Sequence, residues 1–101
     1  IGSPGQYVDY AAAKAAVDTL TVGLSREVAT EGIRVNAIRP GIIDTEIHAS
    51  GGLPDRARDL APIVPMQRPG TADEVADSVL YLLSPQASYV TGALLNVSGG
   101  R

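Results

Sequence analysis

The sequence predicts an α/β fold with a parallel sheet, in the order helix, strand, long connection, helix, strand. Three observations predict it. Two stretches repeat apolar residues every three or four positions, which is the spacing of an amphipathic helix. Two short runs are rich in apolar and β-branched residues, as buried parallel strands are. The second helix lies between the two strands, and such a unit closes as a right-handed crossover in a parallel sheet.

The first predicted helix begins between Ser3 and Tyr7 and ends near Glu31. Its start carries a serine cap, a proline at the first position and a glutamine at the third. Gly32 then suits a left-handed cap. An apolar stripe runs along the helix and consists of Val17, Leu20, Leu24 and Val28. The alanine-rich first half either reflects helix propensity or lets a second helix or a ligand approach the backbone closely.

Tyr10 and Lys14 lie four residues apart on this helix, so their side chains share a face. A phenol loses its proton near pH ~10, so acid/base work near neutrality requires its pKa to fall by about 3 units. A cation about 4 Å away supplies most of that shift at a partly buried site. The pair is therefore a candidate acid/base centre if it faces a cleft. The alternative is a surface lysine lying over the ring or paired with Asp18.

The first predicted strand covers Ile33 to Ile38, and Arg39-Pro40-Gly41 ends it in a turn. Ligands of open parallel sheets bind just beyond the carboxyl ends of strands, so a site is expected from Pro40 to Thr45. Gly41 either permits a close approach to a ligand or simply serves the turn. Thr45 offers a hydroxyl and an N–H for a ligand, or acts as a cap.

Residues 46–69 form a long connection rich in proline and glycine, which predicts a lid over a substrate. Its apolar residues either wall a pocket or pack the segment down; they are Ile47, Leu53, Leu60, Ile63, Val64 and Met66. His48 is the single histidine and the chain has no cysteine, so no metal site is predicted. His48 is expected to be a solvated loop residue, with substrate contact as the alternative.

The second predicted helix starts at a capping box made by Thr71 and Glu74, with Asp73 also in its first turn. Its apolar positions are Val75, Val79, Leu82 and Leu83, and Ser84-Pro85 stops it. The second predicted strand covers Ala93 to Val97 and ends at Gly99-Gly100. Two strands and two helices leave a sheet edge and a helix face uncovered, which predicts the carboxyl-terminal part of a larger α/β protein or assembly with another chain.

Composition narrows the possible functions. The 101 residues allow at most one domain, the formal net charge is -3, and no cluster of basic residues occurs. Binding to nucleic acid or to an anionic membrane is therefore not expected. The absence of cysteine excludes disulfides within the chain and thiolate metal sites, and is compatible with a cytoplasmic location. No apolar stretch of the sequence is long enough to span a bilayer.

With these residues in place, the whole sequence resembles the carboxyl-terminal part of the short-chain dehydrogenases/reductases. The matching segments, in the family's order and spacing, are residues 10–14 (YAAAK), 31–41 (EGIRVNAIRPG), 43–45 (IDT), 71–83 and 89–100 (YVTGALLNVSGG). The resemblance implies that residues 1–101 are the carboxyl-terminal part of a single NAD(P)-binding Rossmann-like domain, a doubly wound parallel sheet, with residues 46–69 as its substrate lid.

By this resemblance, the complete protein is an oxidoreductase that interconverts an alcohol and a ketone or aldehyde with NAD or NADP. Tyr10 is then the acid/base, and Lys14 lowers its pKa and bonds the nicotinamide ribose, so that both side chains contact the cofactor. The turn at Pro40 and Gly41 leads to Ile43 and Thr45, which resemble the contacts to the nicotinamide carboxamide and the adjacent phosphate. The first helix resembles the one that packs against a partner subunit, which implies a homodimer or homotetramer.

The sequence departs from the family pattern in two respects. The glycine-rich phosphate turn, the asparagine motif and the catalytic serine belong upstream of this stretch, so the 101 residues alone are expected to be inactive; Ser3 is too close to Tyr10 to replace that serine. Ser98 stands where many members carry aspartate. The alternatives to an oxidoreductase are a non-catalytic assembly module and a family member with epimerase or dehydratase chemistry.

Overall fold

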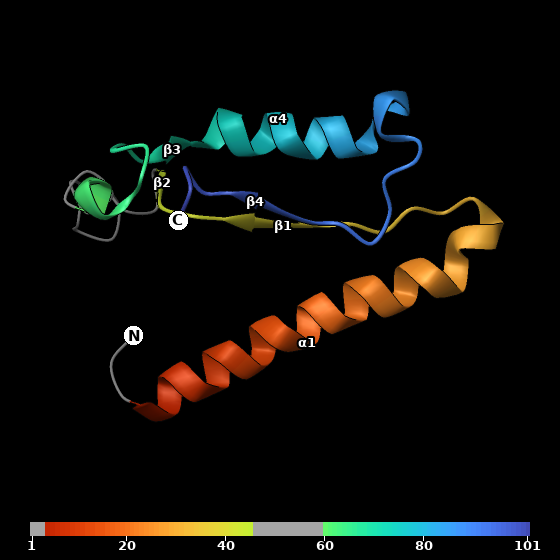
Figure 1. Cartoon of the computed structure of the whole chain (residues 1–101), viewed down its shortest axis with the longest axis horizontal. Coiled ribbons are helices and arrows are strands. Elements are labelled where there is room, and N and C mark those ends of the chain that lie inside the picture. Colours follow the sequence, from red (N-terminus) through yellow and green to blue (C-terminus); the bar gives the residue numbers. More distant parts are fainter. Residues whose placement is uncertain (1–3, 46–59) are drawn as a thin grey trace. The chain divides into compact units, whose positions relative to one another are not determined.

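A computed structural model describes residues 4–45 and 60–101, with side chains described from Val8 onward. The chain divides into two compact units. The first contains Ile1–Ala37 and Tyr89–Leu94, and the second contains Ile38–Ser88 and Leu95–Arg101. The described elements are helices and parallel strands (Figure 1), so the predicted α/β class is confirmed. No helix in the described ranges has the length and apolar character needed to cross a membrane.

The long helix α1 of the first unit spans Pro4–Val28. A 3-10 turn, η1 (Ala29–Glu31), continues it, and Gly32 follows in the left-handed conformation with φ 76°. The Gly32 N–H donates to the Ala29 carbonyl, which closes the helix end. The predicted start and end of this helix are confirmed, while the proposed cap residue Ser3 lies outside the described residues.

The buried side of α1 carries small polar residues. Thr21 is 6% exposed and Ser25 is 3% exposed, and their hydroxyls donate to the carbonyls of Val17 and Val22 at 2.8 and 2.7 Å. Gly92 lies beside Ser25, and a Cβ added to Gly92 would lie 2.9 Å from the Ser25 Oγ, so this close approach requires glycine at position 92.

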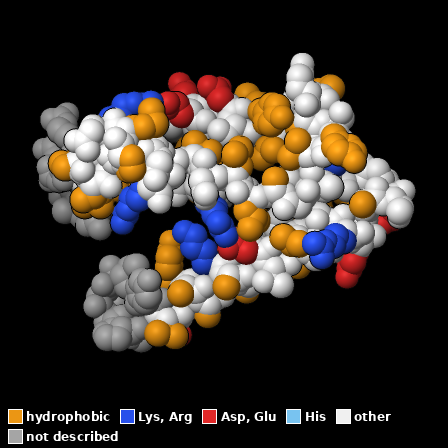
Figure 2. Space-filling model, viewed as in Figure 1, with side chains coloured by type: hydrophobic (Ala, Val, Ile, Leu, Met, Phe, Trp, Pro, Cys, Tyr) orange, Lys and Arg blue, Asp and Glu red, His pale blue; other side chains and the backbone are white. Residues whose placement is uncertain are grey.

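The predicted apolar stripe of α1 is largely at the surface. The exposed fractions of Val17, Leu20 and Leu24 are 55%, 65% and 38%. Apolar side chains of α4, in the second unit, are also exposed. Figure 2 shows the exposed apolar side chains of α1 and of α4 in orange. Among the described residues, the stripe is therefore an exposed face of α1 and not its buried face.

The first predicted strand is shorter and later than the sequence indicated. β1 spans Ala37–Pro40, whereas the prediction began at Ile33. Before Ala37 the Asn36 side chain holds the chain against the backbone of the segment that leads to β4: its amide donates to the Val90 carbonyl at 3.0 Å and accepts from the Ala93 N–H at 2.9 Å. The Asn36 side chain thus takes the place of a backbone partner, and the strand begins only at Ala37.

β1 pairs with β4 (Leu94–Val97), which confirms the second predicted strand to within one residue. The N–H of Ala37 donates to the Ala93 carbonyl, and the N–H of Gly41 donates to the Val97 carbonyl, both at 2.9 Å. Both partners advance by four residues in the same direction, so the pair is parallel. A second two-stranded sheet joins β2 (Ile43–Asp44) in parallel to β3 (Gly70–Thr71).

The second unit also contains α4 (Ala72–Leu83), with Thr71 as its cap. Both hydrogen bonds of the predicted capping box are present. The helix ends at Ser84 in an extended conformation, followed by the 3-10 turn η3 (Pro85–Ala87), as the Ser-Pro pair predicted. The small buried core of this unit consists of Ala61, Val64, Leu82 and Ala87.

Only the last part of the predicted lid is described. It contains the 3-10 turn η2 (Ala61–Ile63), and Val64 behind it is 2% exposed. The Met66 N–H donates to the Gly99 carbonyl at 3.0 Å, so this part is packed down on the carboxyl-terminal turn. His48 and the other lid residues from 46 to 59 lie outside the described residues.

Candidate active site

The Tyr10 and Lys14 side chains lie together on α1, as the four-residue spacing predicted. The Lys14 Nζ donates to the Tyr10 Oη at 3.4 Å and lies 5.4 Å from the centre of the ring. The hydrogen bond is long, and the ammonium is also within range of a cation–π interaction with the ring. Tyr10 is 54% exposed, so the phenol is open to a ligand approaching from the solvent side of the helix.

An open hollow of about 300 Å³ lies beside this pair in the first unit. Its lining consists of Tyr10, Ala11, Lys14, Ala15 and Asp18. The two alanines bring the helix backbone close to the hollow because they carry no side chain beyond Cβ. The hollow therefore combines a phenol hydroxyl and an ammonium with a floor free of bulky side chains, which suits a flat polar ring lying against the helix.

The turn after β1 is tightly packed within the second unit. Gly41 donates its N–H to the Val97 carbonyl, and a Cβ added to Gly41 would lie 2.8 Å from both the Cα and the Cβ of Ser98. The sequence suggested a ligand or a turn as the reason for glycine at this position. The structure shows a further reason, because the backbone of Ser98 occupies the space that a side chain would need.

Ile43 and Thr45 follow this turn and are both half-buried. Ile43 lies opposite Gly70 in the β2–β3 pair, and the Gly70 N–H donates to the Ile42 carbonyl at 2.8 Å. A Cβ at Gly70 would lie 2.9 Å from the Ile43 Cδ1, so the glycine makes room for that side chain. Sequence reasoning missed this strand pair because two residues give no periodic signal.

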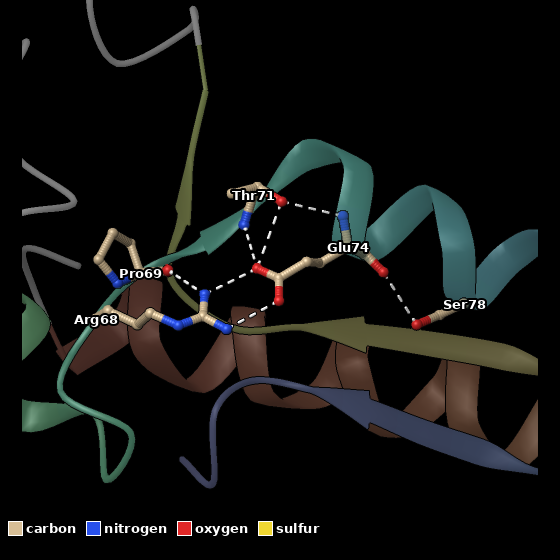
Figure 3. A network of polar contacts seen from close by, with 5 residues as sticks. All are labelled: Arg68, Pro69, Thr71, Glu74 and Ser78. Atoms are coloured by element: carbon tan, nitrogen blue, oxygen red, sulfur yellow. Dashed lines mark hydrogen bonds and ion pairs between the residues drawn. The ribbon is translucent and has the colours of Figure 1, made fainter.

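A polar network anchors β3 to α4 (Figure 3). The two terminal nitrogens of Arg68, Nη1 and Nη2, donate to the two carboxylate oxygens of Glu74 at 2.8 and 2.9 Å, and Nη1 also donates to the Pro69 carbonyl. Glu74 Oε1 in turn accepts from the Thr71 N–H at 3.0 Å. Sequence reasoning recognised the capping box but not Arg68. The sequence did offer a signal, because Arg68 stands three residues before the cap Thr71, and Glu74 follows that cap.

This network lowers the pKa of the Glu74 carboxyl to about 2, mainly through the hydrogen bond from Arg68 and next through the Thr71 N–H. The same contact raises the pKa of Arg68, which stays charged throughout the acidic and neutral range. The two side chains are 48% and 42% exposed, so solvent screening limits what the ion pair contributes.

The lowered pKa of Glu74 predicts an acid-dependent loss of stability. A carboxyl whose pKa is lower in the folded state stabilises the fold above its unfolded pKa, and this stabilisation is lost as the pH falls through the folded pKa. We expect Glu74→Gln to reduce the free energy of unfolding above pH 4.5, and the difference from the wild type to disappear by about pH 2. Urea unfolding of the full-length protein at a series of pH values measures this difference.

Asp73→Asn is the matched control for Glu74→Gln. It removes one negative charge from the same helical turn without touching the network. Glutamine preserves the shape of the capping box, so only the charged contact changes. A Glu74→Gln effect that stays the same from neutral pH down to the folded pKa, or that Asp73→Asn reproduces, contradicts the prediction.

The predicted site residues fall into two sets. Tyr10 and Lys14 belong to the first unit, and Pro40, Gly41, Ile43 and Thr45 belong to the second. Tyr10 and Lys14 contact each other, and the other four lie close together in the sequence, at positions 40–45. In the described part of the chain, no group of three histidine or acidic residues is placed to hold a metal ion.

Comparison with known proteins identifies the family. A family model described as enoyl-(acyl carrier protein) reductase matches residues 2–101. The chain belongs to the short-chain dehydrogenase/reductase family. A relative in this family, described as the uncharacterized oxidoreductase YgfF of Escherichia coli K12, is 59% identical over 101 residues, which is 100% of this chain and 41% of the relative.

Two further short-chain dehydrogenase/reductase relatives illustrate the range of similar proteins. The 3-oxoacyl-[acyl-carrier-protein] reductase FabG of Chlamydia muridarum is 47% identical over 98% of this chain and 39% of its own length. A crystal structure of a putative 2-deoxy-d-gluconate 3-dehydrogenase from Agrobacterium tumefaciens, with bound NADP, is 40% identical with a TM-score of 0.78, covering 90% of this chain and 37% of that one. The chain thus spans about two fifths of the length of the curated relatives it matches.

Proposed function

We propose that this chain is the carboxyl-terminal part of an NAD(P)-dependent oxidoreductase that interconverts an alcohol and a ketone or aldehyde. One observation carries the proposal: the Lys14 ammonium lies 3.4 Å from the Tyr10 hydroxyl beside an open hollow on α1. The relatives include proteins described as oxidoreductases and reductases, which supports this reaction class over other chemistry on the same fold.

The residues of this chain suit a nicotinamide dinucleotide. Lys14 offers ammonium protons to a ribose hydroxyl, and Ala11 and Ala15 leave a slim surface against which the ring and sugar fit. Ile43 and Thr45, which follow the turn at Pro40 and Gly41, are the proposed contacts to the carboxamide and the neighbouring phosphate, and Thr45 offers a hydroxyl and a backbone N–H for them. When bound, the nicotinamide supplies or accepts a hydride. Similar structures contain NADP or NADPH, so NADP or NAD is the proposed cofactor.

Tyr10 is proposed to transfer the proton of the reaction. In reduction, the carbonyl carbon gains a hydride and its oxygen takes the Tyr10 hydroxyl proton, which leaves an alcohol and a phenolate. In oxidation, the phenolate takes the alcohol proton as the hydride leaves the carbon. The Lys14 Nζ donates to the Tyr10 hydroxyl at 3.4 Å and so helps to orient that hydroxyl for the proton transfer.

The experiment that tests this proposal uses the full-length protein that contains this chain. NADPH and NADH binding is measured by cofactor fluorescence, and turnover is measured by cofactor absorbance with a panel of small ketones, aldehydes and 3-oxoacyl thioesters. We expect binding and turnover by the full-length protein, and none by residues 1–101 alone. A full-length protein that binds neither cofactor contradicts the proposal.

A specific observation favours a second candidate, a non-catalytic assembly module. The stripe residues Val17 and Leu20 are more than half exposed, and such a face suits packing against a partner subunit in a homodimer or homotetramer. An assembly module requires the stripe but not the Tyr10 hydroxyl. Cofactor-dependent turnover that is lost in Tyr10→Phe separates the two candidates.

A further inference from the structure

We propose that Arg68 and Glu74 are positioning residues for Ile43–Thr45, the segment that the proposed function places against the cofactor. This inference rests on that proposed function. The inference extends the proposed function by assigning a role to two side chains that are not themselves candidate cofactor contacts. The coupling runs through three links, all within the second unit.

The first link is the two-pronged contact between Arg68 and Glu74. Two parallel N–H···O bonds of 2.8 and 2.9 Å join the two planar groups, a geometry that sets their relative orientation as well as their distance (Figure 3). The same guanidinium donates to the Pro69 carbonyl at 3.1 Å. Arg68 therefore ties its own backbone neighbourhood to the first turn of α4.

The second link joins Glu74 to β3. Its carboxylate oxygen Oε1 accepts from the Thr71 N–H at 3.0 Å, while the Thr71 hydroxyl accepts from the Glu74 N–H at 3.1 Å. Thr71 is at once the cap of α4 and the last residue of β3. The carboxylate thus has Arg68 on one side and the β3 backbone on the other, so the strand is held at its end.

The third link joins β3 to the segment that leads to Thr45. Gly70 donates to the Ile42 carbonyl at 2.8 Å and lies opposite Ile43, while Thr71 lies opposite Asp44. The missing Cβ of Gly70 leaves the space that the Ile43 Cδ1 occupies. Moving β3 by a fraction of an ångström therefore moves the backbone and the side chain of Ile43 together.

The strand pair depends on this support because it is only two residues long on each side. So short a ladder is marginal by itself, since it has few hydrogen bonds to offset the ordering of the backbone. The network fixes residues 68–71 independently of β2 and presents a preformed edge to it. Weakening the network therefore loosens Ile43–Thr45 without removing any proposed cofactor contact.

The test compares Arg68→Lys, Glu74→Gln and the control Asp73→Asn in the full-length protein, with NADPH and NADH as the probes. Lysine keeps the charge but cannot make two parallel bonds, and glutamine keeps the cap but loses the charge. We expect each of the first two variants to raise the Kd of the cofactor about fivefold, a coupling of ordinary size between sites, with kcat at saturating cofactor nearly unchanged. Asp73→Asn should match the wild type.

A second measurement needs no activity. Amide hydrogen exchange should be faster at Gly70 and at residues 43–45 in Arg68→Lys than in the wild type, while exchange in the middle of α4 should stay the same. A purely structural role predicts a lower Tm with an unchanged cofactor Kd.

The outcomes separate the two proposals. Wild-type protein that binds neither NADPH nor NADH contradicts the proposed function. Wild-type protein that binds cofactor, with Arg68→Lys and Glu74→Gln binding it equally well and exchanging residues 43–45 at the wild-type rate, overturns the positioning role alone.

Discussion

Tyr10→Phe is expected to abolish turnover in the full-length protein while changing the Kd of the cofactor by less than about twofold. The variant removes one oxygen, and with it the only proposed proton donor to the carbonyl oxygen. General acid–base groups contribute about 10²- to 10⁴-fold to rate, so the loss should be at least of that order. Because Tyr10 is 54% exposed, removing its hydroxyl should leave the stability of the fold unchanged. Steady-state turnover and cofactor fluorescence measure the two effects.

Tyr89→Phe provides the matched control. Tyr89 is fully exposed in this structure and lies outside the candidate site, so the same loss of a hydroxyl should leave turnover at the wild-type rate. Wild-type turnover by Tyr10→Phe would remove Tyr10 from the mechanism and favour the assembly module. A large loss of cofactor binding in Tyr10→Phe would indicate a binding role instead of a proton-transfer role.

Gly41→Ala is expected to lower the free energy of unfolding by about 1–3 kcal/mol, as overpacked sites generally do. The added Cβ would lie 2.8 Å from the Cα of Ser98, and a backbone atom cannot turn aside as the end of a flexible side chain can. Relief requires Gly41 to move away from β4, which strains its N–H bond to the Val97 carbonyl. The same movement displaces the turn before Ile43, so cofactor binding should weaken too. Urea unfolding and cofactor titration measure the two consequences.

Gly23→Ala is the control for adding a methyl group. Gly23 lies within α1, where an added Cβ meets nothing within 4 Å. Alanine in a helix interior is favoured over glycine by roughly 0.5–1 kcal/mol, so this variant should be more stable than the wild type. If Gly41→Ala and the wild type have equal free energies of unfolding, the Ser98 backbone can shift at little energetic cost, and the prediction is wrong.

Features that depend on near neighbours in the chain were predictable. The end of α1 at Gly32 and the cap of α4 at Thr71 each rest on residues within about one helical turn, and both are confirmed. The approach of Lys14 to Tyr10 follows from helix geometry alone, and the structure places the two groups 3.4 Å apart.

Features that depend on distant residues were not predictable. β1 begins four residues later than predicted because the Asn36 side chain bonds Val90, which lies 54 residues away. The apolar stripe of α1 was predicted from its period, but the buried positions are Thr21 and Ser25, and Gly92 approaches the helix at Ser25. Periodicity reports which residues share a face and cannot report what packs against it.

The amino-acid sequence by itself determined the α/β class, the extents of the two helices, the family and the Tyr10–Lys14 pair, because these depend on spacing within a few residues. Tertiary structure alone decided that Gly41 must be glycine beside Ser98, and that Arg68 and Glu74 anchor the strand opposite Ile43. Those contacts join segments that are distant in sequence and close only in the folded chain, and local propensity carries no signal for such distances.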